Sequence, residues 1–171
     1  SYLEEMIDSV INQSYQNWEL CIADGSGGNQ EIINRMTRYC VEEFRIKYKI
    51  LENNEGISEN TNRALELATG DYRGLLDHDD MLAPNALYEI VKILQERQWE
   101  VLYSDEDMLN QGQHCNPAFK PDFSIDLLRS HNYITHFFVV KKAIVDKIGG
   151  FNKLYDGSQD YDFIFRCIEQ A

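Results

Sequence analysis

Three features are scarce in this sequence, and each absence excludes a class of protein. Positive charge is scarce, because 16 lysine and arginine residues stand against 29 aspartate and glutamate residues, for a net charge of -13. That balance argues against direct binding to nucleic acid or to an anionic membrane surface. The four cysteines include no CxxC pair, so neither a zinc site nor a disulfide framework is indicated. No apolar run approaches the ~18 residues of a membrane span, and no signal peptide is visible, so we expect a cytoplasmic protein.

What the sequence does contain is typical of a single folded domain. Its 171 residues are 43% hydrophobic and 12% aromatic, which excludes a disordered chain. This length supports one domain with a sizeable core and is too short for two domains. No internal repeat or low-complexity segment is present, so residues 1–171 are expected to form one domain.

Segments with helical spacing of apolar residues alternate with short apolar segments. Strands are predicted at 18–23, 46–51, 72–76, 101–104 and 133–140, and helices from Tyr2, around 32–40, from a Ser58 cap to Gly70, from Pro84, around 124–130, at 141–148 and from Asp160. Strands that alternate with helices in this way predict a mostly parallel, doubly wound α/β sheet. Residues 105–121 interrupt the pattern and are expected to be a long polar connection.

Polar residues follow the ends of four predicted strands. Asp24 follows the first, Asn53 and Asn54 follow the second, residues 77–80 follow the third, and residues 105–107 follow the fourth. Ligands of open parallel sheets bind beyond the carboxyl ends of the strands. These side chains are therefore expected to line one rim of the sheet.

The segment "DHDD" at 77–80 places three carboxylates on that rim. Asp77 and Asp79 are separated by one residue, so both can turn toward one hard cation, which prefers oxygen ligands and tolerates bound phosphates. This spacing is typical of a divalent metal and nucleotide site. Spacing alone leaves a second interpretation open, in which Asp79 and Asp80 are a solvated turn whose charge favours the start of the following helix.

Several longer segments resemble one enzyme family. They are "SVINQSYQNWELCIADGSG", "NNEGISENTNRALELATGDYRGLLDHDDMLAPNALYEIV", "YSDED", "FKPDFS", "IGGF" and "GSQDYDFIFR", in this order along the chain. Together they are similar to the family 2 glycosyltransferases. The resemblance implies the GT-A nucleotide-diphospho-sugar transferase fold, a Rossmann-like, mostly parallel sheet flanked by helices.

The resemblance implies a role for each site residue. Asp24 corresponds to the residue that hydrogen-bonds the donor nucleobase, usually uracil, and Asn54 lies with it in the donor nucleotide site. Asp77 corresponds to the carboxylate facing the ribose and sugar, and with Asp79 it binds Mn²⁺ or Mg²⁺ on the diphosphate. Asp160 corresponds to the catalytic base. His114, His131 and His136 show no metal-ligand spacing, and we expect them at the surface or the edge of the core, whereas His78 is expected to be a rim residue.

The implied reaction is an inverting, metal-dependent transfer of a sugar from a nucleotide-diphosphate donor, usually UDP-linked, to a saccharide or lipid-linked acceptor. Alternatives remain at this point. An inactive GT-A-like module would bind a saccharide or nucleotide without turnover. A haloacid-dehalogenase-like phosphohydrolase also places DxD after a strand. In that family the strand is the first one and the motif is followed two residues later by Thr or Val, whereas here the motif lies mid-chain and Met81 stands at that position. Asp24 can instead open an Asx turn, and Asp160 can cap a helix.

The resemblance also predicts the organisation of the chain. Residues 1–104 are expected to form the nucleotide-sugar-binding half and residues 105–171 the acceptor-side half. The family's first strand would precede Tyr2 and a further metal-binding histidine would follow Ala171, so we expect an interior fragment. A sheet without that strand would expose edges that a second copy of the chain can cover. Bacterial surface-polysaccharide enzymes of this kind often act at the inner face of the membrane.

Overall fold

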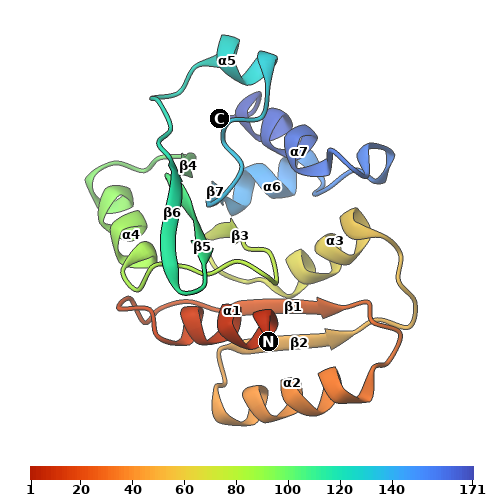
Figure 1. Ribbon diagram of the computed structural model, residues 1–171. Helices are drawn as coiled ribbons and strands as arrows, with labels where there is room; N and C mark the ends of the chain where they lie inside the picture. The colour runs from red at the N-terminus through yellow and green to blue at the C-terminus, as the bar shows by residue number, and fades with distance from the viewer.

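The computed structural model describes all 171 residues of the protein (Figure 1). Its helices are α1 (Tyr2–Ile11), α2 (Gln30–Glu42), α3 (Ile57–Leu67), α4 (Ala86–Glu96), α5 (Ile125–Ser130), α6 (Lys142–Ile148) and α7 (Gln159–Ile168), with a 3-10 turn at Lys153–Tyr155. Its strands are β1 (Leu20–Asp24), β2 (Ile46–Ile50), β3 (Tyr72–Leu75), β4 (Val101–Tyr103), β5 (Glu106–Asn110), β6 (Gln113–Ala118) and β7 (Phe138–Lys141). None of these helices has both the length and the apolar composition that crossing a membrane requires.

The first half of the chain forms a small core around a parallel pair of strands. β1 pairs with β2 in parallel, from Leu20 opposite Ile46 to Asp24 opposite Ile50. The predicted helical spacing from Tyr2 is confirmed, because α1 buries one face against α2 and β2. The buried residues of this cluster are Met6, Ile7, Val10, Met36, Tyr39 and Ile46. Burial of these apolar side chains is the main force that fixes the helices on the strands.

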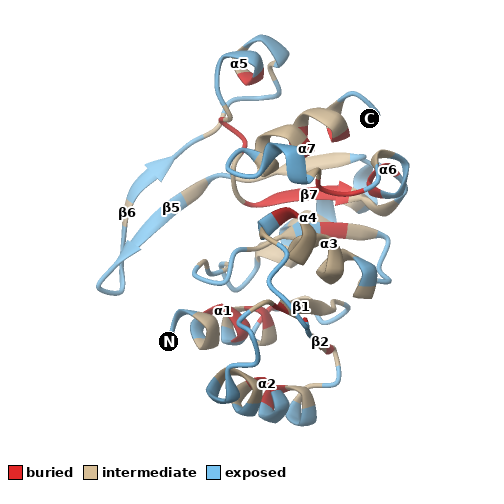
Figure 2. Cartoon of the chain, turned by 90° about the vertical axis from the view of Figure 1, so that its right-hand side faces the viewer, coloured by how far each residue is buried: buried red, intermediate tan, exposed pale blue.

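The second half is built around β7, the most buried strand (Figure 2). β3 and β4 both pair with β7 in antiparallel fashion, so these two outer strands run in the same direction. Phe138 on β7 packs edge-on against Phe163 of α7, and the Phe163 ring stacks on Phe151 with centroids 4.2 Å apart. These rings lie in a cluster of eleven buried residues that includes α5, α6 and α7 side chains.

Strand pairing is parallel in β1–β2, as predicted, but β7 adds antiparallel pairing that the sequence pattern did not predict. The five strands form two separate sheets, because no pairing joins β1 or β2 to β3, β4 or β7. The expected strand at 133–140 begins only at Phe138. Residues 131–137 are irregular, and side chains satisfy several of their backbone groups, as described below.

Three local predictions were wrong. Residues 106–118 form the antiparallel hairpin β5–β6 rather than a long connection without strands. Figure 2 shows this hairpin projecting from the body of the molecule, with most of its length coloured as exposed. Because most of its residues are exposed on both faces, the alternation typical of a strand is missing from its sequence. Ser58 is not a helix cap, since α3 begins at Ile57 with Gly56 in the cap position. Pro84 precedes the Asn85 cap of α4 instead of standing in its first turn.

Candidate functional site

The rim formed by β3, β4 and β7 brings distant parts of the chain together. Leu75 at the end of β3 and Tyr103 at the end of β4 are both opposite Phe138 at the start of β7. An antiparallel strand begins where its partners end. Residues just before β7 therefore lie beside residues just after β3, which places His136 next to Asp77.

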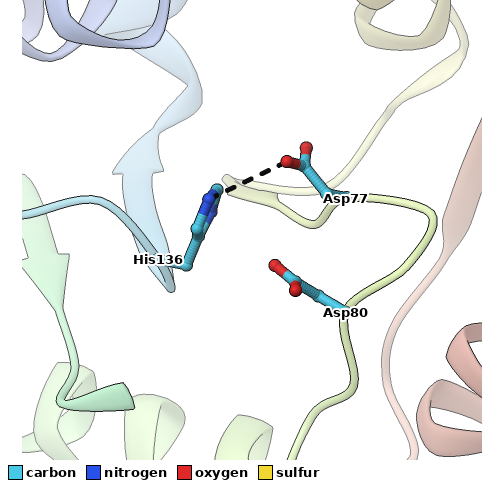
Figure 3. Close-up of side chains that lie close together, drawn as sticks. All are labelled: Asp77, Asp80 and His136. Atoms are coloured by element: carbon cyan, nitrogen blue, oxygen red, sulfur yellow. Dashed lines mark ion pairs between the residues drawn. The ribbon is translucent and has the colours of Figure 1, made fainter. Parts of the chain in front are cut away.

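Asp77, Asp80 and His136 form a cluster at this rim (Figure 3). One ligand atom from each lies within 4.8 Å of the other two. His136 Nε2 is 3.8 Å from Asp77 Oδ2, as the dashed line in Figure 3 marks. A turn in which the Asp80 N–H donates to the Asp77 carbonyl at 3.2 Å returns Asp80 to the same side.

The electrostatics of the cluster favour a bound cation. Burial raises the pKa of Asp80, and the negative charges of Asp77, Asp79 and Glu106 raise it further, while His136 lowers it. A carboxylate with a raised pKa is ionised less readily, and an adjacent positive charge reverses that effect. A divalent cation among these oxygens would supply the charge.

The donor set also fits a divalent cation by chemistry and by size. Carboxylate oxygens suit Mn²⁺ and Mg²⁺, and first-row ions such as Mn²⁺ also accept an imidazole nitrogen. Two ligands on one ion at roughly 2.1 Å lie up to about 4.2 Å apart. The Asp77 side chain is 62% exposed and free to rotate, so a small rotation brings the atoms into that range.

Asp79, which we predicted as a metal ligand with Asp77, lies outside this cluster. Its side chain is 57% exposed and its nearest ionic partner is His78, with His78 Nδ1 3.8 Å from Asp79 Oδ1. Sequence reasoning missed Asp80 and His136. The sequence left Asp80, with Asp79, open to interpretation as a solvated turn ahead of a helix. It predicted His136 at the surface or the edge of the core, because metal-ligand spacing is visible only for residues close in sequence.

Asp24 lies at the end of β1, where it is 8% exposed. Its carboxylate accepts a hydrogen bond from the Ser26 N–H at 2.7 Å and one from the Tyr48 hydroxyl at 2.5 Å. Burial acts to raise the pKa of Asp24, but these two donors outweigh it and the pKa is lowered. Asp24 is thus a fixed anion that accepts hydrogen bonds. The Ser26 contact is an Asx turn, so that alternative describes the local geometry correctly.

Asn54 lies beside the loop that follows Asp24. Its Oδ1 accepts from the Gly56 N–H at 3.1 Å and from Asn60 Nδ2 at 2.9 Å. The same Asn60 amide closes on Gly25, where an added Cβ would stand 2.6 Å from Nδ2. The structure therefore brings Asp24 and Asn54 to neighbouring turns, and a side chain at position 25 would displace the Asn60 amide.

Asp160 lies in the first turn of α7. Its Oδ2 accepts a hydrogen bond from Asn132 Nδ2 at 3.2 Å, and Asn132 Oδ1 accepts from the Thr135 N–H at 3.4 Å. Asn132 and Thr135 belong to residues 131–137, the irregular segment that also contains His136. One short stretch of chain thus links the predicted base to the cluster of Asp77, Asp80 and His136.

Comparison with known proteins identifies relatives of this arrangement. The chain matches the sequence profile described as "Glycosyl transferase family 2" over residues 1–149. It is 41% identical over 171 residues to the uncharacterized protein y4gI of Sinorhizobium fredii, covering 99% of this chain and 19% of the relative. It is 33% identical to the O-antigen biosynthesis protein RfbC of Myxococcus xanthus, covering 99% of this chain and 13% of the relative. The chain therefore spans less than a fifth of the length of either relative.

Solved structures share the fold. TarS 1-349 of S. aureus in complex with UDP-GlcNAc has a TM-score of 0.78 at 16% identity, over 97% of this chain and 49% of that chain. The mannosyltransferase PcManGT of Pyrobaculum calidifontis, with GDP-Man and Mn²⁺, has a TM-score of 0.59 at 20% identity, over 88% of this chain and 44% of that protein. The GT-A prediction is thereby confirmed. The profile match covers most of the sequence, so this chain belongs to glycosyl transferase family 2.

Proposed function

We propose that this chain transfers a sugar, with inversion, from a nucleotide-diphosphate donor to a saccharide or lipid-linked acceptor, and that it uses a divalent cation. The convergence of Asp77, Asp80 and His136 at the rim formed by β3, β4 and β7 is the observation that carries the proposal. Family membership supplies the reaction class. UDP is the first nucleotide to test, because a structural neighbour is solved with UDP-GlcNAc.

The donor nucleoside would bind at the turns after β1 and β2. Asp24 accepts two hydrogen bonds already, and an ionised carboxylate has room for more, so it can accept an N–H from a nucleobase. Its lowered pKa keeps it ionised at neutral pH. Asn54 fixes the neighbouring turn through its side-chain oxygen and would shape the wall of the same site.

The diphosphate would lie at the cluster of Asp77, Asp80 and His136. When bound, the cation neutralises the charge that develops on the leaving diphosphate. Asp77, Asp80 and His136 would bind that ion, with Mn²⁺ or Mg²⁺ as the candidates, and the exposed Asp79 would face the donor from the same turn. With a net charge of -13, a rim without a cation would repel a diphosphate.

Asp160 is proposed as the base that takes the proton from the acceptor hydroxyl. A direct displacement needs the base on the face opposite to the leaving group, which agrees with its place on α7, away from β1 and β2. The hydrogen bond from Asn132 orients the Asp160 carboxylate while leaving its second oxygen free of side-chain partners. Residues 105–171 would then contact the acceptor. The reaction would take place in the cytoplasm, at the inner face of a bacterial membrane.

Calorimetric titration of UDP into the chain, with and without Mn²⁺, tests the donor site. We expect binding that needs Mn²⁺ and that falls at least tenfold in Asp77→Asn. Asp146→Asn on α6 is the matched control, because its side chain is 57% exposed and pairs only with Lys142. Equal binding with and without Mn²⁺, or equal loss in both variants, would contradict the proposal.

Release of UDP from UDP-GlcNAc separates an enzyme from a binding module. A transferase releases UDP when an acceptor is supplied, and Asp160→Asn should lower this rate about 100-fold or more while UDP still binds. A module without activity binds the nucleotide sugar and releases no UDP with any acceptor. The parent protein is the right sample for this assay, since the chain spans a small part of its relatives.

A further inference from the structure

The irregular segment 131–137 contains two residues of the candidate site, Asn132 and His136. Because it precedes β7 rather than belonging to it, its backbone groups lack strand partners, and buried backbone groups must find other partners. Ile134 and Phe137 are buried here, so water cannot serve them all. Two charged side chains from the hairpin region supply the partners of Ile134 and His136.

Glu106, the first residue of β5, contacts the segment at two points. Its Oε1 accepts a hydrogen bond from the Thr135 hydroxyl at 2.9 Å, and its Oε2 accepts from the His136 N–H at 3.1 Å. Lys120, two residues after β6, donates from Nζ to the Ile134 carbonyl at 2.6 Å and to the His136 carbonyl. The two side chains also pair with each other, with Nζ 3.3 Å from Glu106 Oε2.

Together the two residues bind both backbone polar groups of His136, its N–H and its carbonyl. An ammonium has three protons to donate, and Lys120 has three acceptors, so it is fully satisfied. The Lys120 side chain is 4% exposed, the least of any ion-pair partner in the molecule, and the Glu106 side chain is 33% exposed. Burial lowers the pKa of Lys120, and Glu106 opposes that change.

Such a pair is a costly way to stabilise a fold. Buried ion pairs are often no more stabilising than apolar side chains of the same volume, whereas removal of one partner is strongly destabilising. Their benefit is a fixed geometry. Here the geometry that is fixed is the backbone at His136 and, through Thr135 and Asn132, the hydrogen bond to Asp160.

We propose that Glu106 and Lys120 are positioning residues, which fix residues 131–137 so that His136 faces Asp77 and Asn132 orients Asp160. This inference rests on the proposed function for its consequence in catalysis. In this proposal, residues at the two ends of the hairpin β5–β6 fix the position of His136 relative to that of Asp160. In this assignment both act through residues 131–137 and neither is a ligand of the cation.

The test compares Glu106→Gln and Lys120→Met with an exposed pair of the same kind. Lys92 and Glu89 on α4 are 3.4 Å apart and about half exposed, so Glu89→Gln and Lys92→Met are the matched controls. Amide hydrogen exchange measured by NMR should quicken at least tenfold for residues 131–137 in the first two variants, with β1 and β2 unchanged. Mn²⁺ affinity, measured by calorimetry, should fall about 10- to 100-fold, as for other residues that orient metal ligands.

Thr135→Val guards against variants that fail to fold, because it removes only the hydroxyl bond to Glu106. Unchanged exchange at 131–137 in folded Glu106→Gln and Thr135→Val would overturn the inference, and so would faster exchange with an unaltered Mn²⁺ affinity. Absence of Mn²⁺ binding by the unmodified chain contradicts the proposed function instead. Hydrogen exchange then decides whether the two residues fix the segment.

Discussion

Gly74 on β3 is packed directly against the Phe137 ring, one residue from His136. A Cβ at position 74 would stand 2.4 Å from Phe137 Cζ and 3.0 Å from Cε2. Phe137 is 9% exposed and has little space to move. Glycine at position 74 leaves room for the Phe137 ring to pack directly on β3. This packing keeps the neighbouring residue His136 close enough to β3 for its side chain to reach Asp77.

We predict that Gly74→Ala destabilises the protein by about 1–3 kcal/mol, the usual cost of overpacking a filled site. Urea unfolding followed by circular dichroism measures it. Gly70→Ala is the control, since an added Cβ there meets nothing closer than 3.6 Å and its φ is not positive. That control should be neutral or slightly stabilising, because alanine restricts the unfolded chain. Equal loss of stability in both variants would contradict the packing argument.

At the scale of single residues, the sequence predicted the site in part. Asp24, Asn54 and Asp77 were expected at one rim because each follows a predicted strand, and the structure places Asp24 at the end of β1, Asn54 after β2 and Asp77 after β3. His136 could not be found in this way, since it precedes a strand and joins the rim only because β7 is antiparallel. Which of these residues bind donor and metal stays a prediction.

At the scale of elements, the segment NNEGIS (residues 53–58) and the helix α3 that follows it contact the chain just ahead of α7. The α3 N-terminus has no side-chain cap of its own. Asp156, just ahead of α7, lies near that N-terminus, and its Oδ1 accepts a hydrogen bond from the fully buried Ser58 hydroxyl at 2.5 Å. Asn62 on α3 bonds both the N–H and the carbonyl of Phe151. A carboxylate near a helix N-terminus is favourable, so these contacts set the loop from which Asp160 starts.

We predict that Ser58→Ala lowers the free energy of unfolding by about 1–3 kcal/mol, because it removes the hydrogen bond from a buried hydroxyl to the charged Asp156 carboxylate. Chemical denaturation measures the change. Thr61→Ala on the same helix is the control, since the Thr61 hydroxyl bonds only to the Ile57 carbonyl one turn earlier. A loss in Ser58→Ala no larger than in Thr61→Ala would show that the contact with Asp156 contributes nothing.

Elements with strong apolar periodicity were the predictable ones. The spacing around Met6 and Val10 indicated α1, and the structure confirms a helix there. The hairpin β5–β6 was missed for the opposite reason, because strands that are exposed on both faces have no apolar alternation to read. Tertiary contact, not local pattern, determines such elements.

At the scale of the whole molecule, one carboxylate connects the two sheets. Glu19, the residue before β1, accepts from the N–H groups of Thr69 and Gly70 ahead of β3, from the Thr69 hydroxyl, and from Lys47 on β2 at 2.5 Å. No strand pairing joins β1 to β3. These hydrogen bonds are therefore a polar link between halves whose apolar cores are separate clusters.

This link makes a prediction about stability and pH. Burial acts to raise the pKa of Glu19, but its hydrogen bonds outweigh it and lower the pKa from 4.5 to about 2. A carboxyl whose pKa is lower in the folded state stabilises that state above the unfolded pKa, and the contribution is lost as the pH falls through the folded pKa. Glu19→Gln should thus cost on the order of 2 kcal/mol at pH 7, and the difference from the unmodified chain should shrink between about pH 4.5 and pH 2. Urea unfolding across that range measures it, with the exposed Glu89→Gln as control. A cost for Glu19→Gln that is the same at pH 3 and pH 7 would mean that packing, rather than the ionised carboxylate, connects the sheets.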